Sequence, residues 1–436
     1  MTLQRERKTI AGSIDAPASK SSMQRAVACA TMAEGRSRLK SGELCADSRA
    51  ALGLAASLGA AVSFDAEAIA IVGSARFGSS SGDFPGELEL DCGESGLCMR
   101  MFSPIAAILN GRAKLLGRGS LAKRPMGMVE EPLRALGAEC RSTAGFPPLF
   151  VRGPLRGGAI DIDASESSQL LTGLLVALPL APEDSELRVS NAVSKGYLDL
   201  TIDTCAAFGV AIERDPSFSR FFIQGGQRYR ATDFPVEGDW SGAAFLVVAA
   251  AIAAGPEGLE IGGLRMESNQ PDKAVLRAAT AAGTPIGGHG AGLHIGRARL
   301  GARLQARLQA RLQAFEFDAT DCPDLFPPLA ALAAACVGVS GIKGVHRLKG
   351  KESDRAASIA SMLGALGVPV SFEKDWMRIQ GGVIHGGTID ACGDHRIAMA
   401  AAVAALAAEG PVTILGAECV SKSWPSFFDD LDSVSH

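Results

Sequence analysis

The feature of this 436-residue sequence that most constrains its fold is an internal repeat of about 72 residues. Alanine-rich amphipathic segments with polar, helix-capping starts recur 74, 72, 74, 82 and 72 residues apart. They begin near Lys20, Glu94, Glu166, Trp240, Cys322 and Asp394. Such a period is too long for a thin solenoid, and each copy mixes helical with alternating patterns. The repeat therefore predicts compact domains in which helices cover sheets.

A second predicted helix follows within each copy and ends at a glycine. The glycines that mark these ends are Gly59, Gly137, Gly209, Gly283 and Gly367. Short alternating segments come next, for instance residues 61–64 in the first copy and 376–379 in the fifth. The unit is thus strand–helix–strand–helix–strand–strand. Six units predict an α/β protein of two domains, each built from three units.

One step of the repeat is longer because residues 302–313 read Ala-Arg-Leu-Gln three times. We interpret this insert as a tandem duplication on a surface loop or helix extension. The alternative is a basic helix for nucleic acid, with Arg303, Arg307 and Arg311 on one face. No aromatic residue interleaves these arginines for base stacking, which favours the first interpretation.

Composition excludes several classes of function. The net charge of −4 and the pI near 6.0 argue against a general nucleic-acid or membrane-surface binder. The ten cysteines include no C-x-x-C pair and no zinc-type cluster, which favours reduced thiols in the cytoplasm and no metal. The apolar run at residues 242–255 is too short for a membrane span, and the basic N-terminus has no apolar signal segment behind it. No nucleotide-binding loop is present, so we expect no cofactor.

The first predicted helix begins with a cluster of hydroxyl and cationic side chains. Lys20 lies between Ser19 and Ser21, and Arg25 follows one turn later. Serines that cap backbone N–H groups, the positive end of the helix dipole and two cations suit a phosphate or a carboxylate. For this segment alone, a plain capped helix remains the alternative.

Ionisable and polar residues recur at the starts of the other predicted helices. These are Arg100, the run Ser167-Ser168-Gln169, Asp324, the run Asp394-His395-Arg396, and, in the second helix series, Arg124, Ser194, the run Lys351 to Arg355, and Lys422. Each alone reads as a solvated surface charge. Cations at equivalent positions of a repeat instead predict binding of two anionic substrates. Cys92 and Cys98 have apolar neighbours and are interpreted as packing residues.

Several motifs, taken in order and spacing over nearly the whole chain, carry a resemblance to a known family. They are Ser19-Lys20-Ser21-x-x-x-Arg25, Gly96-x-x-Met99-Arg100, Arg124-Pro125, Ser167-Ser168-Gln169, Pro323-Asp324, Lys351-Glu352-Ser353-Asp354-Arg355, Asp394-His395-Arg396-Ile397-Ala398-Met399 and Cys419-Val420-Ser421-Lys422. The chain resembles the 5-enolpyruvylshikimate-3-phosphate (EPSP) synthases. This implies two inside-out, barrel-like α/β domains, residues 20–237 and residues 1–19 with 238–436, hinged near Lys20 and near 237–239.

The resemblance also implies roles for individual residues in the transfer of an enolpyruvyl group from phosphoenolpyruvate to shikimate 3-phosphate. Shikimate 3-phosphate would be bound by Lys20, Ser21, Arg25, Ser167, Ser168, Gln169, Ser194, Asp324 and Lys351. Phosphoenolpyruvate would be bound by Lys20, Gly96, Arg100, Arg124, Gln169, Arg355, Arg396 and Lys422. Glu352 would protonate the methylene carbon and Asp324 would accept the hydroxyl proton, with Lys20 assisting. We expect a monomeric cytoplasmic enzyme that uses these small molecules and no nucleic acid, membrane, metal or cofactor.

The chain departs from the family pattern beside the expected phosphoenolpyruvate site. Where the family commonly has Asn-Ala-Gly-Thr, this sequence has Glu94-Ser95-Gly96-Leu97, and Arg347 stands where an asparagine is frequent. Glu94 could turn outward, pair with an arginine, or act as an acid that tunes one. These changes bear on sensitivity to inhibitors such as glyphosate, and they leave the reaction class unchanged.

Two other functions compete with this interpretation. The sister enolpyruvyl transferases that act on UDP-N-acetylglucosamine carry a cysteine loop where this chain reads Leu115-Leu116-Gly117-Arg118. A non-catalytic anion-binding repeat protein would keep the arginines but would not need Glu352 and Asp324 at helix starts.

Overall fold

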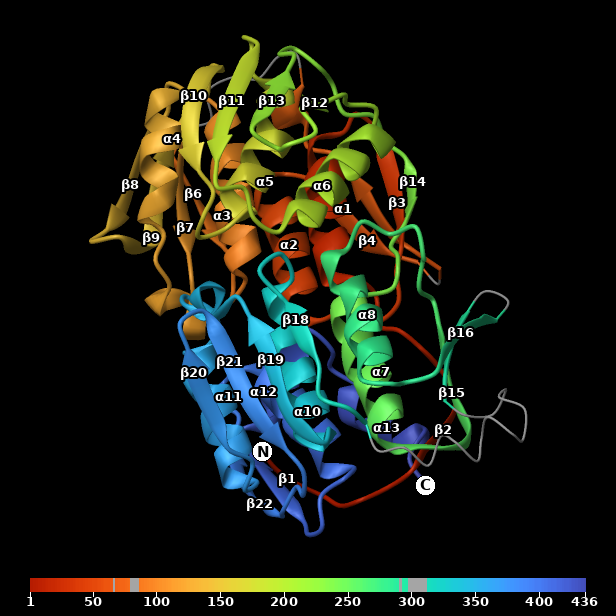
Figure 1. Cartoon of the computed structure of the whole chain (residues 1–436). Coiled ribbons are helices and arrows are strands. Elements are labelled where there is room, and N and C mark those ends of the chain that lie inside the picture. The colour runs from red at the N-terminus through yellow and green to blue at the C-terminus, as the bar shows by residue number, and fades with distance from the viewer. Residues whose placement is uncertain (66, 79–85, 290–291, 297–311) are drawn as a thin grey trace. The chain divides into compact units, whose positions relative to one another are not determined.

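The computed structural model describes residues 1–65, 67–78, 86–289, 292–296 and 312–436 (Figure 1). The chain forms two compact units. Unit 1 contains Met1–Ser19 and Glu237–His436, and unit 2 contains Lys20–Val236. Most of the predicted insert, residues 302–311, lies outside the described residues. At its end, the backbone N–H of Gln313 donates to the carbonyl of Ala282 at 3.0 Å.

Unit 2 holds three copies of the repeating unit, each with one four-stranded sheet. The first copy contains α1 (Lys20–Met32), β3 (Arg36–Lys40), α2 (Ala46–Ser57), β4 (Ala61–Phe64), β5 (Ile69–Val72), the 3-10 helix η1 (Ala75–Phe77) and β14 (Asp233–Pro235). The second contains β6 (Glu87–Asp91), α3 (Gly96–Ile108), β7 (Arg112–Leu116), η2 (Gly119–Lys123), η3 (Gly127–Val129), α4 (Glu130–Ala135), β8 (Glu139–Thr143) and β9 (Phe146–Arg152). The third contains β10 (Gly158–Asp163), α5 (Gln169–Ala177), η4 (Leu178–Leu180), β11 (Ser185–Ser190), α6 (Lys195–Ala207), β12 (Glu213–Arg214) and β13 (Arg220–Ile223).

Unit 1 repeats the pattern, with two four-stranded sheets and one three-stranded sheet. The fourth copy contains β2 (Ile10–Asp15), α7 (Trp240–Ala253), β15 (Ala254–Gly262), η5 (Pro271–Ala274), α8 (Val275–Ala281), β16 (Ile286–His289) and β17 (Gly292–Ile295). The fifth contains β18 (Glu316–Asp318), η6 (Pro323–Leu325), α10 (Phe326–Ala335), β19 (Gly338–Lys343), η7 (Val345–Leu348), α11 (Arg355–Ala365), β20 (Val370–Glu373) and β21 (Trp376–Gly381). The sixth contains β22 (Gly387–Asp390), α12 (His395–Ala405), β23 (Val412–Leu415), η8 (Ala417–Lys422), α13 (Phe427–Ser433) and β1 (Thr2–Arg5).

Strand pairing within a copy follows one rule, which the second copy shows. β6 pairs with β7 in parallel, with α3 as the crossover between them, and β7 and β8 both pair with β9 in antiparallel. The predicted order strand–helix–strand–helix–strand–strand is therefore confirmed, as is the α/β fold class. Segments distant in sequence complete three of the sheets, because β14 pairs with β3, β2 pairs with β15 and β1 pairs with β23.

The first helix of each copy lies inside its unit and the sheets lie outside. In α7 every residue from Trp240 to Ala250 is buried, because α8, α10, α12 and β15 all pack against this helix. The prediction of an amphipathic helix is therefore wrong for α7, and it is equally wrong for α3, α10 and α12, which are buried over nearly their whole length. Alanines and other small residues let such helices approach one another closely on all sides.

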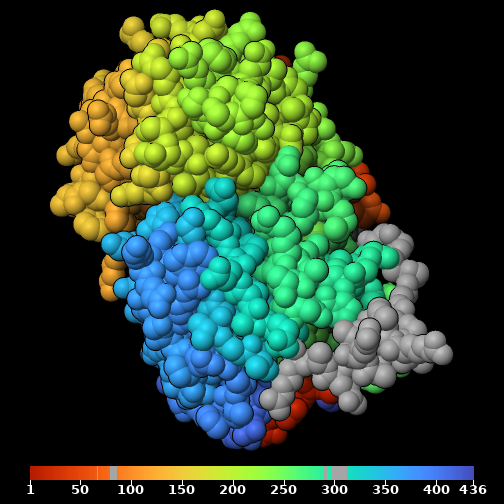
Figure 2. All heavy atoms as spheres, in the orientation of Figure 1, coloured from red at the N-terminus to blue at the C-terminus, as the bar shows by residue number. Residues whose placement is uncertain are grey.

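The outer faces of the sheets remain in contact with solvent. In the fifth copy, Val339 of β19 is 52% exposed and Phe372 of β20 is 47% exposed. The residues of these strands, coloured cyan to blue, form part of the surface in Figure 2, while α10 packs against β19 and β21 from within. Each unit is thus an inside-out α/β structure with its core built around helices.

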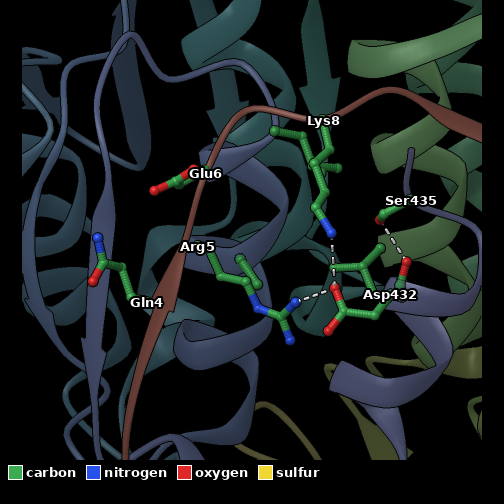
Figure 3. Close-up of a pocket in the computed structure, with 9 residues that line it drawn as sticks. Gln4, Arg5, Glu6, Lys8, Asp432 and Ser435 are labelled. Atoms are coloured by element: carbon green, nitrogen blue, oxygen red, sulfur yellow. Dashed lines mark hydrogen bonds and ion pairs between the residues drawn. The ribbon is translucent and has the colours of Figure 1, made fainter.

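The N-terminal strand is tied to the last helix of unit 1 by charge (Figure 3). The side chains of Arg5 and Lys8 both point toward Asp432 of α13, with the Lys8 Nζ 3.6 Å from its carboxylate. The Arg5 guanidinium also lies 5.1 Å from the ring centroid of Phe428. Since β1 pairs with β23 along its whole length, these contacts close the sixth copy.

A glycine at the end of the last strand lets that strand meet the end of the central helix in more than one copy. A Cβ added to Gly381 at the end of β21 would lie 2.2 Å from the carbonyl oxygen of Ala333 and 2.3 Å from that of Cys336. In the second copy, a Cβ on Gly153 would lie 2.1 Å from the carbonyl oxygen of Leu109. The repeat therefore requires a residue without a side chain at this junction.

We predict that Gly381→Ala lowers the free energy of unfolding by about 1–3 kcal/mol, because the backbone at the end of α10 must move to admit the methyl group. Gly364→Ala is the matched control, since a Cβ at that position in α11 meets nothing within 4 Å. It should stabilise the helix by roughly 0.5–1 kcal/mol. Urea unfolding followed by tryptophan fluorescence measures both, and equal effects of the two substitutions would contradict the close approach.

Candidate active site

The start of α3 is shaped so that two arginines meet over its first turn. The Ser95 hydroxyl caps this helix by accepting from the backbone N–H of Cys98 at 3.2 Å. A Cβ on Gly96 would lie 2.8 Å from Nη1 of Arg124 and 3.0 Å from Nη1 of Arg100. Both guanidiniums therefore lie against the backbone of the glycine. Together with the backbone N–H groups and the dipole of α3, they form a site for an anion.

Arg100 is held in place by two further elements. Its Nη1 donates to Oε1 of Gln169, the first residue of α5, at 2.7 Å, and its Nη2 donates to the carbonyl of Pro125 at 3.0 Å. Arg100 and Arg124 are only 4% and 7% exposed, so their charges act with little screening by water. Four residues predicted to bind phosphoenolpyruvate, Gly96, Arg100, Arg124 and Gln169, thus lie together in unit 2.

Lys20 is the first residue of α1, and its Nζ lies 3.2 Å from Oδ2 of Asp47. Asp47 is 5% exposed and belongs to the first turn of α2. The sequence analysis missed this partner. An acid in the first turn of a helix is a common capping feature, so nothing in the sequence marks Asp47 as the residue that meets Lys20.

Arg25 lies deeper in unit 2 and joins three helices. Its Nε donates to Oγ1 of Thr201 on α6 at 2.8 Å, and its Nη2 donates to Oγ1 of Thr172 on α5 at 3.3 Å. Its guanidinium also lies 5.6 Å from the ring centroid of Tyr197. Burial lowers the pKa of Arg25 to about 10, so the side chain still carries its charge at neutral pH. Sequence reasoning placed Arg25 at the site but gave no sign of the two threonines.

The predicted serines lie where the helices of unit 2 begin. Ser21 is the second residue of α1. Ser168 precedes α5 and is 5% exposed, and the hydroxyl of Ser167 accepts from the backbone N–H of Gln169 at 3.2 Å. Ser194 precedes α6 in a left-handed conformation with φ of 53°. All four hydroxyls are therefore held next to helix starts, where an anion is favoured.

In unit 1, three cations surround the carboxylate of Asp324, which lies in η6. Oδ1 of Asp324 is 3.2 Å from Nζ of Lys351 and 2.8 Å from Nη1 of Arg355. Oδ2 is 3.1 Å from Nη2 of Arg396. Residues from η6, from the segment before α11 and from α12 thus converge on one carboxylate.

Arg355 is the centre of this cluster and is fully buried. Its Nη2 donates to Oε2 of Glu352 at 2.5 Å, and its Nε donates to Oδ2 of Asp394 at 3.0 Å. Lys422 approaches the other oxygen of Glu352 at 3.8 Å. The four cations Lys351, Arg355, Arg396 and Lys422 face the three carboxylates of Asp324, Glu352 and Asp394, which leaves one net positive charge for an incoming anion.

The cluster sets the protonation of its members. Burial would raise the pKa of Asp324, but Arg396, Lys351 and Arg355 hold it well below its ordinary value. Burial lowers the pKa of Lys351, and Asp324 partly opposes this effect. Burial would likewise lower the pKa of Arg355, but Asp394, Glu352 and Asp324 raise it above its ordinary value. Asp324 is therefore ionised at neutral pH.

The structure shows the surroundings of four further residues whose roles the sequence did not decide. Burial raises the pKa of Cys92 and of Cys98, so neither thiol is a ready nucleophile and both act in packing. His395 is the first residue of α12 and is 1% exposed. Glu94 is exposed, and its carboxylate accepts a hydrogen bond from the Ser120 hydroxyl at 2.9 Å.

Two hollows in unit 1 are lined by none of the predicted site residues. One, of about 380 Å³, lies beside Arg5, Lys8 and Asp432 (Figure 3). The other, of about 420 Å³, lies between the ends of α7, α10 and α12.

Within the part of the chain that the structure describes, no cluster of three acidic, histidine or cysteine residues could hold a metal. The helices described there are all too short or too polar to span a membrane.

Comparison with solved structures places this fold among the enolpyruvyl transferases. EPSP synthase from Acinetobacter baumannii superposes with a TM-score of 0.80 at 26% identity, covering 100% of this chain and 98% of that chain. The enolpyruvyl transferase NikO from Streptomyces tendae shares the fold with a TM-score of 0.76 at 18% identity and the same coverage.

Sequence comparison identifies the family. The model of the EPSP synthase (3-phosphoshikimate 1-carboxyvinyltransferase) family matches residues 4–431. A 3-phosphoshikimate 1-carboxyvinyltransferase from Methanoculleus marisnigri is 36% identical over 422 residues, which cover 95% of each chain. The chain belongs to the EPSP synthase family, and the resemblance inferred from its motifs is confirmed.

The pKa of Asp324 leads to a prediction about stability and pH. A carboxylate whose pKa is lowered by folding stabilises the folded state fully at pH values above its unfolded pKa, which is near 3.8. This contribution is lost as the pH falls below that value toward the folded pKa. We predict that Asp324→Asn costs about 2 kcal/mol of unfolding free energy at pH 6–8, the scale of hydrogen bonds to a charged group. The cost should shrink below about pH 4.

Urea unfolding of wild type and variant between pH 3 and pH 8 measures this difference. Asp429→Asn is the control, because Asp429 is an exposed carboxylate of the same unit, in the first turn of α13. It should cost less than about 1 kcal/mol. A difference for Asp324→Asn that grows on acidification would show that the carboxylate is not held ionised by its neighbours.

Proposed function

We propose that this chain transfers the enolpyruvyl group of phosphoenolpyruvate to the 5-hydroxyl of shikimate 3-phosphate and releases phosphate. Family membership over nearly the whole chain supports this reaction. The single structural observation that carries the chemistry is that one guanidinium holds two carboxylates: Arg355 binds Asp324 through Nη1 at 2.8 Å and Glu352 through Nη2 at 2.5 Å. A protein that only bound anions would have no use for this pair.

The proposed binding residues form two overlapping sets, one for each substrate. We assign phosphoenolpyruvate to the cations at the starts of the helices and shikimate 3-phosphate mainly to the hydroxyls. The phosphoenolpyruvate set is Lys20, Gly96, Arg100, Arg124, Gln169, Arg355, Arg396 and Lys422. The shikimate 3-phosphate set is Lys20, Ser21, Arg25, Ser167, Ser168, Gln169, Ser194, Asp324 and Lys351. Residues of both units thus take part, and we propose residues 20–237 and residues 1–19 with 238–436 as the two functional domains.

The reaction is an addition followed by an elimination. In the addition, the 5-hydroxyl oxygen bonds to C2 of phosphoenolpyruvate, Asp324 accepts the hydroxyl proton, and Glu352 donates a proton to the methylene carbon. In the elimination, the Glu352 carboxylate removes a proton from the new methyl group. The C–O bond to phosphate then breaks, and the proton on Asp324 leaves with the phosphate. Lys20 assists proton transfer and balances the phosphate charge.

Asp324 and Glu352 need opposite protonation states at the start of the cycle. Asp324 is ionised because three cations surround it, as the base requires. Glu352 must carry a proton although Arg355 and Lys422 lie beside it. The negative charges of phosphoenolpyruvate, once bound to Arg396 and Lys422, offset these cations and make a protonated Glu352 more favourable.

The remaining features of the protein follow from this proposal. We propose a monomer that acts in the cytoplasm, because the proposed residues all belong to one chain and its ten cysteines are free.

We predict that Glu352→Gln lowers turnover by on the order of a hundredfold or more, the scale of a lost general acid. Glutamine keeps the size of the side chain and an acceptor for Arg355 but has no proton of suitable pKa to give. The KM for phosphoenolpyruvate should change much less than kcat. Release of phosphate from shikimate 3-phosphate and phosphoenolpyruvate is the measurement.

The control is Glu373→Gln, since Glu373 is a 66% exposed carboxylate of the same unit that pairs with Arg378. Unchanged turnover in Glu352→Gln would remove Glu352 from the mechanism. If the wild type released phosphate only when UDP-N-acetylglucosamine replaced shikimate 3-phosphate, the proposed function itself would be wrong.

A further inference from the structure

We propose that Glu94 is a positioning residue for phosphoenolpyruvate: its carboxylate holds the loop that carries Arg124 against the start of α3. This inference rests on the proposed role of Arg124 in binding phosphoenolpyruvate. It concerns a residue at which this chain departs from the common family pattern, and it decides between the orientations that the sequence left open for that side chain.

The carboxylate of Glu94 closes on the first two residues of η2. Its Oε2 accepts from the backbone N–H of Ser120 at 3.2 Å and lies 2.9 Å from the Ser120 hydroxyl, which donates to it. Its Oε1 lies where a side chain on Gly119 would be, since a Cβ there would come within 2.3 Å of this oxygen. Gly119 also has a φ of 49°, a conformation that favours glycine. The carboxylate is therefore held by two hydrogen bonds from Ser120 and lies close to Gly119.

Neighbouring contacts join the same two segments. The backbone N–H of Arg118 donates to the carbonyl of Gly93 at 2.7 Å, and the Arg118 side chain pairs with Asp91. The turn between β6 and α3 and the loop between β7 and η2 are thus fastened by backbone, by ion pair and by Glu94. Of these ties, the one from Glu94 lies nearest to Gly96 in sequence.

The loop held by Glu94 leads directly into η2, and Arg124 follows the last residue of η2. η2 ends at Lys123, and the backbone N–H of Arg124 donates to the carbonyl of Leu121 at 3.0 Å within this turn. The guanidinium of Arg124 then lies over Gly96, two residues after Glu94. A substitution of Glu94 can therefore shift the guanidinium of Arg124 through a short stretch of chain. Small shifts of this guanidinium cost affinity, because it must be placed to within a fraction of an ångström to meet an anion.

The charge of Glu94 opposes its positioning effect. A carboxylate close to an anion site repels the substrate, but Glu94 is exposed and this repulsion is screened by water and salt. Hydrogen bonds to an ionised acceptor are stronger than those to an amide, so a carboxylate at position 94 holds the loop more strongly than an amide would. The two effects change the KM for phosphoenolpyruvate in opposite directions, which makes the sign of the change informative.

The test is steady-state kinetics with both substrates on Glu94→Ala, Ser120→Ala, the double variant and Glu94→Gln. Glu94→Ala should raise the KM for phosphoenolpyruvate about five- to tenfold, the effect of losing roughly one solvent-exposed hydrogen bond. The kcat and the KM for shikimate 3-phosphate should change less than about twofold. The double variant should be no worse than Glu94→Ala, because both substitutions break the same contact. Glu94→Gln should recover part of the loss, since its amide oxygen accepts from Ser120.

A second variant reproduces the loss without removing the carboxylate. Gly119→Ala puts a methyl group where Oε1 of Glu94 lies and should raise the same KM. The control is Glu89→Ala, because Glu89 is 62% exposed on β6 and pairs with Lys114 of β7 at 3.0 Å, so it removes a carboxylate from the same pair of strands. It should leave both KM values unchanged.

The outcomes separate this inference from the proposed function. A lower KM in Glu94→Ala, additive effects in the double variant, or equal changes in both KM values would overturn the positioning role. Arg124→Ala provides the reference: it should raise the KM for phosphoenolpyruvate by more than Glu94→Ala does. If Arg124→Ala has no such effect, the assignment of Arg124 is wrong; if it has the effect and Glu94→Ala does not, only the inference about Glu94 fails.

Discussion

The packing of alanine-rich helices against one another inside each unit is the constraint on which the rest of the structure depends. α7 has no polar face, because other helices and a sheet surround it. Charged side chains can then be placed only at helix ends or on the outer surface. At the helix starts they meet the positive end of the dipole, so anions and carboxylates gather there. The fold thus concentrates cations in a protein whose net charge is −4.

Burying so many charges is favourable only when they are paired. Arg355 is fully buried, and it can remain so because its three nitrogens face Asp324, Glu352 and Asp394. In the proposed mechanism the same pairing prepares the chemistry, since it fixes the base Asp324 and the acid Glu352 on one guanidinium and keeps Asp324 ionised. In unit 2 the buried Arg100 is held by neutral acceptors instead, since its Nη1 donates to Gln169 and its Nη2 donates to a backbone carbonyl. In that mechanism, the same contacts serve stability and reactivity.

The repeat and the helix starts could be predicted from the sequence because both are local patterns with a fixed period. Lys20, Gly96, Asp324 and Asp394 all lie within one turn of a helix or 3-10 helix start, where the pattern predicts them. The partners of these residues could not be predicted. Asp47 meets Lys20, and Thr201 meets Arg25, through packing between segments far apart in the sequence. The amphipathic interpretation of α7 also failed, because composition does not reveal that a helix is covered on every side.

In the proposed mechanism, Glu352 is held by Arg355 and delivers a solvent-exchangeable proton to the methylene carbon of phosphoenolpyruvate. Turnover in D₂O tests this step. Wild-type enzyme should place deuterium on the methylene carbon of the product, because the methyl group of the intermediate gains a deuteron and then loses one of its three hydrogens. Glu352→Gln should lose this incorporation together with turnover. Incorporation at the wild-type rate in that variant would contradict the account.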